Sequence, residues 1–337
     1  MDFKVLYNQF YQEVKQAHKI VIIPHKNPDG DSIGASLGLY NLLTQLNKQV
    51  DVVMPNRFPV GFDWLPNAKV CIDFEKETER ATKILKGCDL LIFVDFNSIK
   101  RLEKLADLID SLTIHKMMVD HHPYPDDIAQ LQISNTAVSS TCELTFDIIR
   151  NTPLLDHCNT QVAECFYTGI MTDTAALNHN SSRKETYDIV GELISFKVDK
   201  EKIHRNIFHS NSLNRFKLIG YIFSEKLIVL PNVNVAIIPL TKADLEKFDY
   251  VDGDTEGFAN LPLSIKDIDM SVFIVERADR VKLSFRSRGK VVVNKFANQY
   301  FNGGGHQHAA GAESTMSFDK VLDLLLTEIP IYYESEL

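Results

Sequence analysis

The chain has 337 residues, 45% of them hydrophobic, so it can bury a substantial core, and its length favours two domains over one. Its 45 acidic residues outnumber its 36 lysines and arginines, and the formal charge of −9 argues against a tight, non-specific grip on long duplex nucleic acid. The apolar runs are too short for a membrane span, no signal-peptide pattern opens the chain, and the five cysteines form no CxxC pair. We therefore expect a cytoplasmic protein with reduced thiols and no membrane association.

Short β-branched segments alternate with helical patterns in the first half of the chain. This alternation predicts an α/β fold in which helices cover both faces of a parallel sheet. The predicted strands are residues 19–24, 50–54, 89–94, 115–119 and 131–134. Between the first two, residues 32–46 place apolar side chains near one face at helical spacing, and Gly34 and Gly38 would allow this helix to pack closely.

The pattern changes in the second half. Residues 156–223 are mostly helical, and we expect part of this stretch to connect two domains. Strand patterns return, with few helices between them, at residues 226–230, 233–239, 270–276, 281–285 and 290–293. The prediction is an N-terminal domain over residues 1–190, a helical connector over 191–223, and a smaller α/β domain with a mixed sheet over 224–337. The active-site cleft is expected between the two domains.

Acidic and histidine side chains gather at the ends of the predicted strands. They are His25, Asp29 and Asp31 after the first strand, Asp95 after the third, Asp120, His121 and His122 after the fourth, and Asp173 at the end of a helical stretch. Because the carboxyl ends of parallel strands meet at one edge of a sheet, these side chains should become neighbours. Taken alone, Asp31 is equally compatible with capping the helix that follows it. Four such motifs together favour a two-metal phosphoesterase centre.

The types of side chain in this cluster favour particular metals. Carboxylates and imidazoles without cysteine suit Mn²⁺, with Mg²⁺ or Co²⁺ as competitors, better than structural zinc. Two divalent ions about 3.5–4 Å apart are suited to in-line attack on phosphorus.

The combination of these motifs resembles the DHH (Asp-His-His) phosphoesterase superfamily. Residues 281–287 and 303–311 are similar to its C-terminal DHH-associated domain. The resemblance implies one metal held by His25, Asp29 and Asp95, and a second held by Asp31, Asp95, His121 and Asp173, with Asp95 as the bridge. It implies that His122 faces the phosphate, while Asp120 orients the segment. The chain departs from the family pattern at Ala175, where glycine is frequent, and over residues 176–180, which lack an aromatic-Arg pattern.

Positive charge gathers in the predicted second domain. Seven lysines and arginines between residues 277 and 295 face only Glu276 and Asp279 as nearby acids, so an anion should bind there. Arg286 offers a bidentate fork for phosphate, and three successive glycine amides can form a concave donor nest. The expected substrate-binding residues are Asn27, Ser284, Arg286, Gly303, Gly304, Gly305 and His306.

The resemblance favours a nuclease and phosphatase of small substrates. It implies hydrolysis of very short single-stranded oligoribonucleotides and of 3′-phosphoadenosine 5′-phosphate (pAp), as in the nanoRNase and pAp-phosphatase branch. Hydrolysis of c-di-AMP or its linear product pApA is the alternative. Inorganic pyrophosphatase and exopolyphosphatase rank below it, because a small symmetric substrate gives no reason for a nucleotide site. A non-catalytic nucleotide sensor conflicts with the complete ligand set, and a homodimer is left open.

Overall fold

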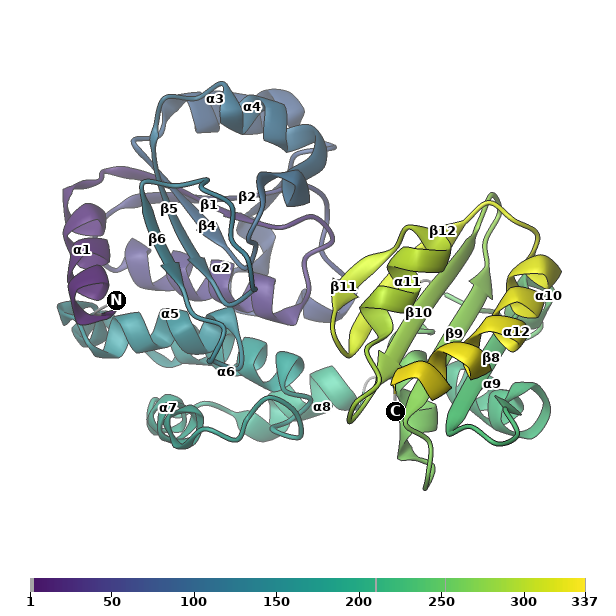
Figure 1. Ribbon diagram of the computed structural model, residues 1–337. Helices are drawn as coiled ribbons and strands as arrows, with labels where there is room; N and C mark the ends of the chain where they lie inside the picture. Colours follow the sequence, from purple (N-terminus) through teal and green to yellow (C-terminus); the bar gives the residue numbers. More distant parts are fainter. Residues whose placement is uncertain (1–2, 210, 252, 337) are drawn as a thin grey trace. The chain divides into compact units, whose positions relative to one another are not determined.

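The computed structural model describes residues 3–209, 211–251 and 253–336 (Figure 1). The chain divides into two compact units, Met1–Ser210 and Asn211–Leu337. This boundary falls inside residues 191–223, for which a connector is predicted, and helices lie on both sides of it. Within the described ranges, every helix is too short or too polar to span a lipid bilayer.

A parallel sheet of six strands forms the centre of the first unit (Figure 1). Its strands are β1 (Lys19–Pro24), β2 (Gln49–Met54), β3 (Cys71–Asp73), β4 (Leu90–Val94), β5 (His115–Asp120) and β6 (Leu131–Ser134). Five of them confirm the predicted strands to within one residue, and β3 was missed because three residues are too few to show a period. The order β3-β2-β1-β4-β5-β6 places β1 beside β4, so the chain reverses direction across the sheet at that point. Ligand sites in open α/β sheets occur at such a switch point.

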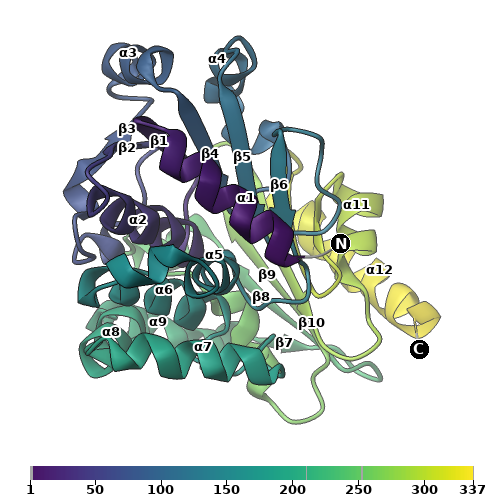
Figure 2. The ribbon, with the colours of Figure 1, turned by 90° about the vertical axis from the view of Figure 1, so that its left-hand side faces the viewer.

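Helices cover both faces of this sheet, as predicted (Figure 2). One face packs against α1 (Phe3–Gln16), α2 (Gly30–Thr44), α5 (Thr141–Arg150) and α6 (Thr160–Asp173). The other packs against α3 (Thr78–Gly87), the 3₁₀ helix η3 (Ile99–Leu105) and α4 (Ala106–Asp110). Helices α7 (Lys184–Ser195) and α8 (Lys200–Phe208) pack on α6, and short 3₁₀ turns are η1 (Val60–Phe62), η2 (Ala68–Val70) and η4 (Pro153–His157).

Helix α2 differs from its prediction, because it is buried on nearly all sides instead of along one apolar stripe. It begins two residues earlier than expected, since Asp29 caps it. Its glycines allow backbone contact with α6: a Cβ on Gly34 would lie 2.6 Å from the carbonyl oxygen of Cys165. A Cβ on Gly169 in α6 would lie 2.2 Å from Cys142 Sγ and 3.0 Å from Asp31 Oδ1. The first turn of α2 and the C-terminal half of α6 are thereby held together.

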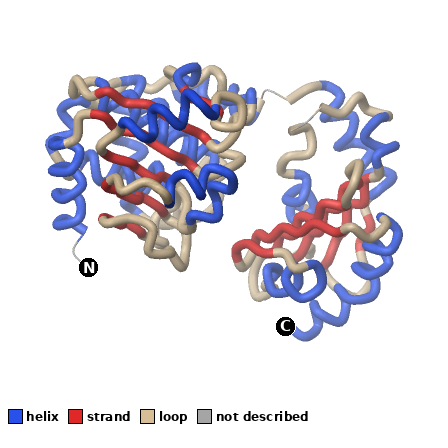
Figure 3. The backbone as a smooth tube through the Cα atoms, turned by 90° about the horizontal axis from the view of Figure 1, so that it is seen from above, coloured by secondary structure: helices blue, strands red, loops and turns tan. Residues whose placement is uncertain are grey.

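A mixed sheet of six strands forms the second unit (Figure 3). Its strands are β7 (Ile228–Val229), β8 (Val235–Leu240), β9 (Met270–Glu276), β10 (Val281–Ser287), β11 (Gly304–His306) and β12 (Ala309–Ser314), in the order β11-β12-β10-β9-β8-β7. Among the described strands of this sheet, only the β8–β9 pair is parallel. The helices are α9 (Leu213–Tyr221), the π-helical turn η5 (Ile222–Lys226), α10 (Lys242–Glu246), the 3₁₀ helix η6 (Phe258–Ser264), α11 (Val293–Phe301) and α12 (Phe318–Glu336).

The predicted strand at residues 290–293 is wrong. Gly289 adopts φ +71°, which reverses the chain after β10, and Val293 begins α11. Of the β-branched residues that suggested a strand, Val291 and Val293 are instead buried in the core that contains side chains of α11 and α12. Strands β11 and β12 were missed because they consist largely of glycine and alanine, which carry little strand signal.

Replacing Gly34 with alanine tests the close approach of α2 and α6. The added Cβ requires a backbone carbonyl to move, so the free energy of unfolding should fall by about 1–3 kcal/mol. Gly191→Ala in α7 is the control, because a Cβ there would meet nothing within 4 Å. That change should be neutral or should stabilise the helix by up to about 1 kcal/mol. Urea unfolding with a chelator present measures both variants, and equal stabilities would contradict this packing.

Candidate metal centre

The loop after β1 contributes two of the candidate ligands. His25 is 4% exposed and directly follows the strand. Asp29 is the N-cap of α2, and its Oδ1 accepts hydrogen bonds from the amides of Asp31 and Ser32, both at 3.1 Å. The capping role considered for Asp31 therefore belongs to Asp29, and Asp31 lies in the first turn of the helix.

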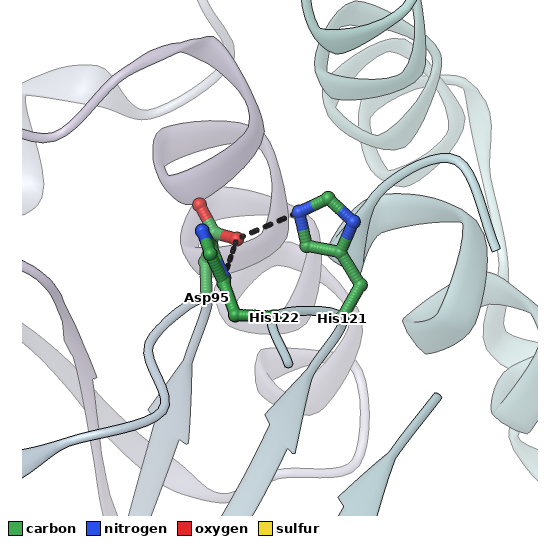
Figure 4. Close-up of side chains that lie close together, drawn as sticks. All are labelled: Asp95, His121 and His122. Atoms are coloured by element: carbon green, nitrogen blue, oxygen red, sulfur yellow. Dashed lines mark ion pairs between the residues drawn. The ribbon is translucent and has the colours of Figure 1, made fainter. Parts of the chain in front are cut away.

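Asp95 lies at the centre of the cluster (Figure 4). It directly follows β4, is 1% exposed, and has φ +67°, a left-handed conformation that costs energy for a residue with a side chain. Its Oδ2 is 3.4 Å from His25 Nε2. Its Oδ1 is 3.7 Å from His121 Nε2 and 3.8 Å from His122 Nδ1. One carboxylate thus faces three imidazoles, with its two oxygens turned toward different ones.

His121 connects this group to two further carboxylates. Its Nε2 is 3.9 Å from Asp31 Oδ2 and 3.7 Å from Asp173 Oδ2. Three groups could each hold an ion, with ligand atoms within 4.8 Å of one another: His25 with Asp29 and Asp95, Asp31 with His121 and Asp173, and Asp95 with His121 and His122. All six expected ligands are therefore brought together, and His122 also lies within ligand distance.

Asp120 supports His122. Its fully buried carboxylate accepts a hydrogen bond from the backbone amide of His122 at 3.1 Å. The other carboxylate oxygen lies 2.8 Å from His122 Nδ1. This pair fixes the orientation of the His122 ring. The His121 and His122 rings pack edge to face, with centroids 4.7 Å apart.

The tautomer of His25 indicates what this site can hold. Its Nδ1 lies 2.7 Å from the carbonyl oxygen of Lys26, so Nδ1 carries the proton that is donated there. Burial lowers the pKa of His25, which keeps the ring neutral. The lone pair of Nε2 then faces the Asp95 carboxylate, and a cation between them converts this unfavourable arrangement into coordination.

The carboxylates repel one another in the same way. Burial, followed by the charges of Asp31 and Asp29, raises the pKa of both Asp95 and Asp173 above the usual range for aspartate. Such carboxylates bind protons or a cation to relieve the repulsion. The oxygen and nitrogen donors at this edge of the sheet therefore fit divalent metal ions.

Sequence reasoning missed the first turn of α5. The amides of Thr141 and Cys142 donate to Asp31, and the Thr141 hydroxyl donates to Asp95. The only signal was the spacing of Ser140 and Glu143, which is typical of a helix N-cap and carries no indication of a metal site.

The segment after Asp173 adopts an unusual conformation. Ala175, Ala176 and Leu177 have φ of 46°, 59° and 65°, at and just after the position where the family often has glycine. The Thr174 hydroxyl supports this left-handed turn, because it donates to Ile170 O at 2.6 Å and accepts the Leu177 amide at 2.9 Å. A conformation costly for non-glycine residues is thus maintained beside a candidate ligand.

Asn27 adopts φ 53° in the loop before α2 and pairs with Asn56 in both directions. Its amide donates to Asn56 Oδ1 at 2.7 Å, and its own Oδ1 accepts from Asn56 Nδ2 at 2.9 Å. This pair fixes the loop that carries His25 and Asp29.

The remaining expected substrate residues lie in the second unit. One face of β10 carries Lys282, Ser284 and Arg286. On the other face, Leu283 and Phe285 are buried under α11 and α12. This unit also has a second hydrophobic core, and the strand residues in it belong to β8 and β9. A cavity of about 590 Å³ adjoins β10 and β12, lined by Lys282, Leu283, Ser284, Phe301, Asn302, Gly303, Gly311, Ala312 and Glu313.

The glycine run differs from the donor nest that was expected. Gly304, Gly305 and His306 form β11, the edge strand of the sheet, paired in antiparallel register with β12. A Cβ on Gly303 would lie 2.4 Å from Gly311 O, so only glycine allows this approach. Arg286 is partly buried, and its Nη1 donates to its neighbour Phe285 O at 2.9 Å.

Comparisons with known proteins agree with this geometry. Residues 19–170 match the family described as "DHH family, N-terminal domain", and residues 232–329 match the "DHHA1 domain". The bifunctional oligoribonuclease and PAP phosphatase NrnA of Bacillus subtilis is 28% identical over 313 residues, covering 92% of this chain and 93% of that protein. The cyclic-di-AMP phosphodiesterase GdpP of Bacillus subtilis is 26% identical over 98% of this chain and 50% of its own length. The crystal structure of an exopolyphosphatase-related protein from Bacteroides fragilis has a TM-score of 0.93 at 39% identity, with 98% of each chain covered.

Metal addition should stabilise the protein in a pH-dependent way. Protons and cations compete for Asp95 and Asp173, whose raised pKa values mean that the metal-free protein loses stability as pH rises. Adding Mn²⁺ to chelator-treated protein should therefore raise the unfolding midpoint more at about pH 8 than at about pH 6. An ion at a hundredfold excess over its Kd contributes about 2.7 kcal/mol. Thermal unfolding measures the midpoints, and Asp95→Asn is the control. A Mn²⁺-induced rise of the midpoint that is equal or smaller at the higher pH would contradict this prediction.

Proposed function

Because the chain belongs to the DHH phosphoesterase family, a family of metal-dependent hydrolases, we propose that it hydrolyses very short oligoribonucleotides and pAp. The observation that carries this proposal is the buried Asp95 carboxylate, shared between His25 on one side and His121 on the other. A centre of this kind suits phosphate esters in general. The substrate class is supported by similarity over nearly the full length to a relative named as an oligoribonuclease and PAP phosphatase.

In this proposal two divalent ions are held as the family resemblance implies. His25, Asp29 and Asp95 hold one, and Asp31, Asp95, His121 and Asp173 hold the other. The mixed oxygen and nitrogen donors favour Mn²⁺, with Mg²⁺ and Co²⁺ as competitors. When bound, the pair supplies electrostatic stabilisation of the phosphoryl group and a water-derived nucleophile. The cytoplasm is the proposed location, supported by five free cysteines.

His122 contacts the substrate phosphate in this mechanism. Its Nδ1 is engaged by Asp120, so Nε2 is the ring nitrogen that faces a phosphate oxygen in this proposal, and it donates a hydrogen bond there when both ring nitrogens carry a proton. Asp120 acts through His122 by holding the ring in one orientation. His25 remains neutral and uses Nε2 for coordination, because Nδ1 donates to Lys26 O.

The second unit provides nucleotide recognition in this proposal. The proposed contacts of the second unit are Ser284, Arg286, Gly303, Gly304, Gly305 and His306, and Asn27 is the proposed contact of the first unit. Ser284 and Gly303 line the cavity beside β10 and β12, whose size suits a nucleotide-sized ligand. Arg286 lies on the same face of β10 as Ser284, and its guanidinium can bind phosphate in a bidentate manner.

One panel of substrates tests the activity. Purified protein with Mn²⁺ is given pAp, RNA dimers to pentamers, a long RNA, pApA, c-di-AMP, pyrophosphate and polyphosphate, and initial rates are compared. We expect pAp and the shortest RNAs to be cleaved fastest, and His121→Ala to abolish cleavage of all of them. Faster cleavage of the long RNA than of the dimers, or unchanged turnover by His121→Ala, would contradict the proposal.

Two other activities have specific support. Similarity to a c-di-AMP phosphodiesterase over 98% of this chain makes c-di-AMP or pApA the second candidate substrate. The Bacteroides fragilis structure, described as exopolyphosphatase-related, keeps polyphosphate in the panel. The fastest initial rate in the panel decides between the candidates.

Arg286→Ala should separate recognition from chemistry. Loss of a charged hydrogen bond of about 1.5–3 kcal/mol predicts a decrease of roughly 10- to 100-fold in kcat/KM for pAp and RNA dimers. A small synthetic phosphodiester, which contains no nucleotide, should be turned over nearly as before. Arg288→Ala is the matched control, because that exposed arginine pairs with Asp269. Equal losses on nucleotides and on the synthetic ester would rule out this role for Arg286.

A further inference from the structure

The first turn of α5 contacts the candidate ligands of both ions. The amides of Thr141 and Cys142 donate to Asp31 Oδ2 at 2.7 Å and Oδ1 at 2.9 Å, so both oxygens of that carboxylate are held. The Thr141 hydroxyl donates to Asp95 Oδ1 at 2.8 Å. All four side chains are at most 2% exposed, so water does not compete for these hydrogen bonds.

This turn is itself held firmly. The Ser140 hydroxyl caps α5 by accepting the Glu143 amide at 2.9 Å. The buried Glu143 carboxylate accepts from the Ser139 amide at 3.0 Å, from the Ser139 hydroxyl at 2.5 Å and from the Thr186 hydroxyl at 2.9 Å. Thr141 is therefore placed by a network that extends from α5 to α7.

The Thr141 hydroxyl contacts one particular oxygen of the Asp95 carboxylate, Oδ1. Oδ1 of Asp95 faces His121 and His122, while Oδ2 faces His25. A hydrogen bond to Oδ1 fixes rotation of the carboxylate about its terminal bond, which is otherwise broad. Each oxygen is thereby kept on the side of its own group of ligands.

We infer that Thr141 is a positioning residue for the metal centre: its hydroxyl orients the shared Asp95 carboxylate, and its backbone amide anchors Asp31. The two ion sites therefore keep fixed positions relative to each other. This role rests on the two-ion centre of the proposed function. Outer partners of this kind change metal affinity by about 10- to 100-fold when they are removed.

Helix α5 supplies a matched control for this inference. Thr145 lies one turn after Thr141 and is also fully buried, but within the described part of the chain its hydroxyl has no hydrogen-bond partner. Replacing either threonine with valine removes one buried hydroxyl at nearly constant volume. Only Thr141→Val removes a contact to a candidate ligand.

The test compares Thr141→Val, Thr141→Ser and Thr145→Val with the parent protein. Calorimetric titration with Mn²⁺ gives the number and affinity of bound ions, and electron paramagnetic resonance shows whether two bound Mn²⁺ ions are spin-coupled. We expect Thr141→Val to lower the affinity about 10- to 100-fold and to weaken the coupled signal. Thr141→Ser, which keeps the hydroxyl, and Thr145→Val should resemble the parent.

The outcomes separate this inference from the proposed function. Two coupled Mn²⁺ ions bound by Thr141→Val with parental affinity would overturn the positioning role, even if the variant is less stable with chelator. A parent protein that binds no coupled pair would overturn both the role and the two-ion centre. If Thr141→Val does not fold, Thr141→Ala against Thr145→Ala provides the same comparison.

Discussion

Negative charge concentrated at one edge of the sheet is the constraint that the rest of the first unit has to satisfy. Asp31, Asp95 and Asp173 are brought together around His121, with Asp95 almost fully buried. Buried carboxylates are costly unless hydrogen bonds and opposite charges compensate for the lost water. Backbone amides from α5 satisfy Asp31, a threonine hydroxyl contacts Asp95, and the remaining repulsion, visible in the raised pKa of Asp95 and Asp173, is what divalent cations relieve.

Rigid elements hold this arrangement in place. The switch point between β1 and β4 brings the loops that carry His25 and Asp95 to the same edge. Close packing of α2 on α6, which Gly34 and Gly169 permit, joins the helices that carry Asp31 and Asp173. The left-handed conformations at Asp95 and after Asp173 cost energy locally, and the surrounding hydrogen bonds and packing sustain them.

In our proposal, chemistry and recognition belong to different parts of the chain. A centre built from aspartates and histidines acts on phosphate esters in general, and a fold does not by itself select a substrate. Relatives named as an oligoribonuclease and PAP phosphatase and as a c-di-AMP phosphodiesterase share this family, so we place selectivity in the second unit. There the face of β10 with Ser284 and Arg286, beside the glycine-rich edge of the sheet, provides polar contacts next to a cavity.

The sequence alone determined the parallel sheet, the helices on both faces and the gathering of the acidic motifs, because period-2 and period-3.6 patterns and strand-end positions are local signals. It did not show β11 and β12, where glycine and alanine carry little strand preference, and it suggested a strand at residues 290–293, where a glycine turn prevails. Only the tertiary structure decided that Asp120 holds His122 and that Thr141 joins Asp31 to Asp95. Thr141 is 110 residues from Asp31 and 46 from Asp95, and its contacts exist only once α5 packs beneath the sheet edge.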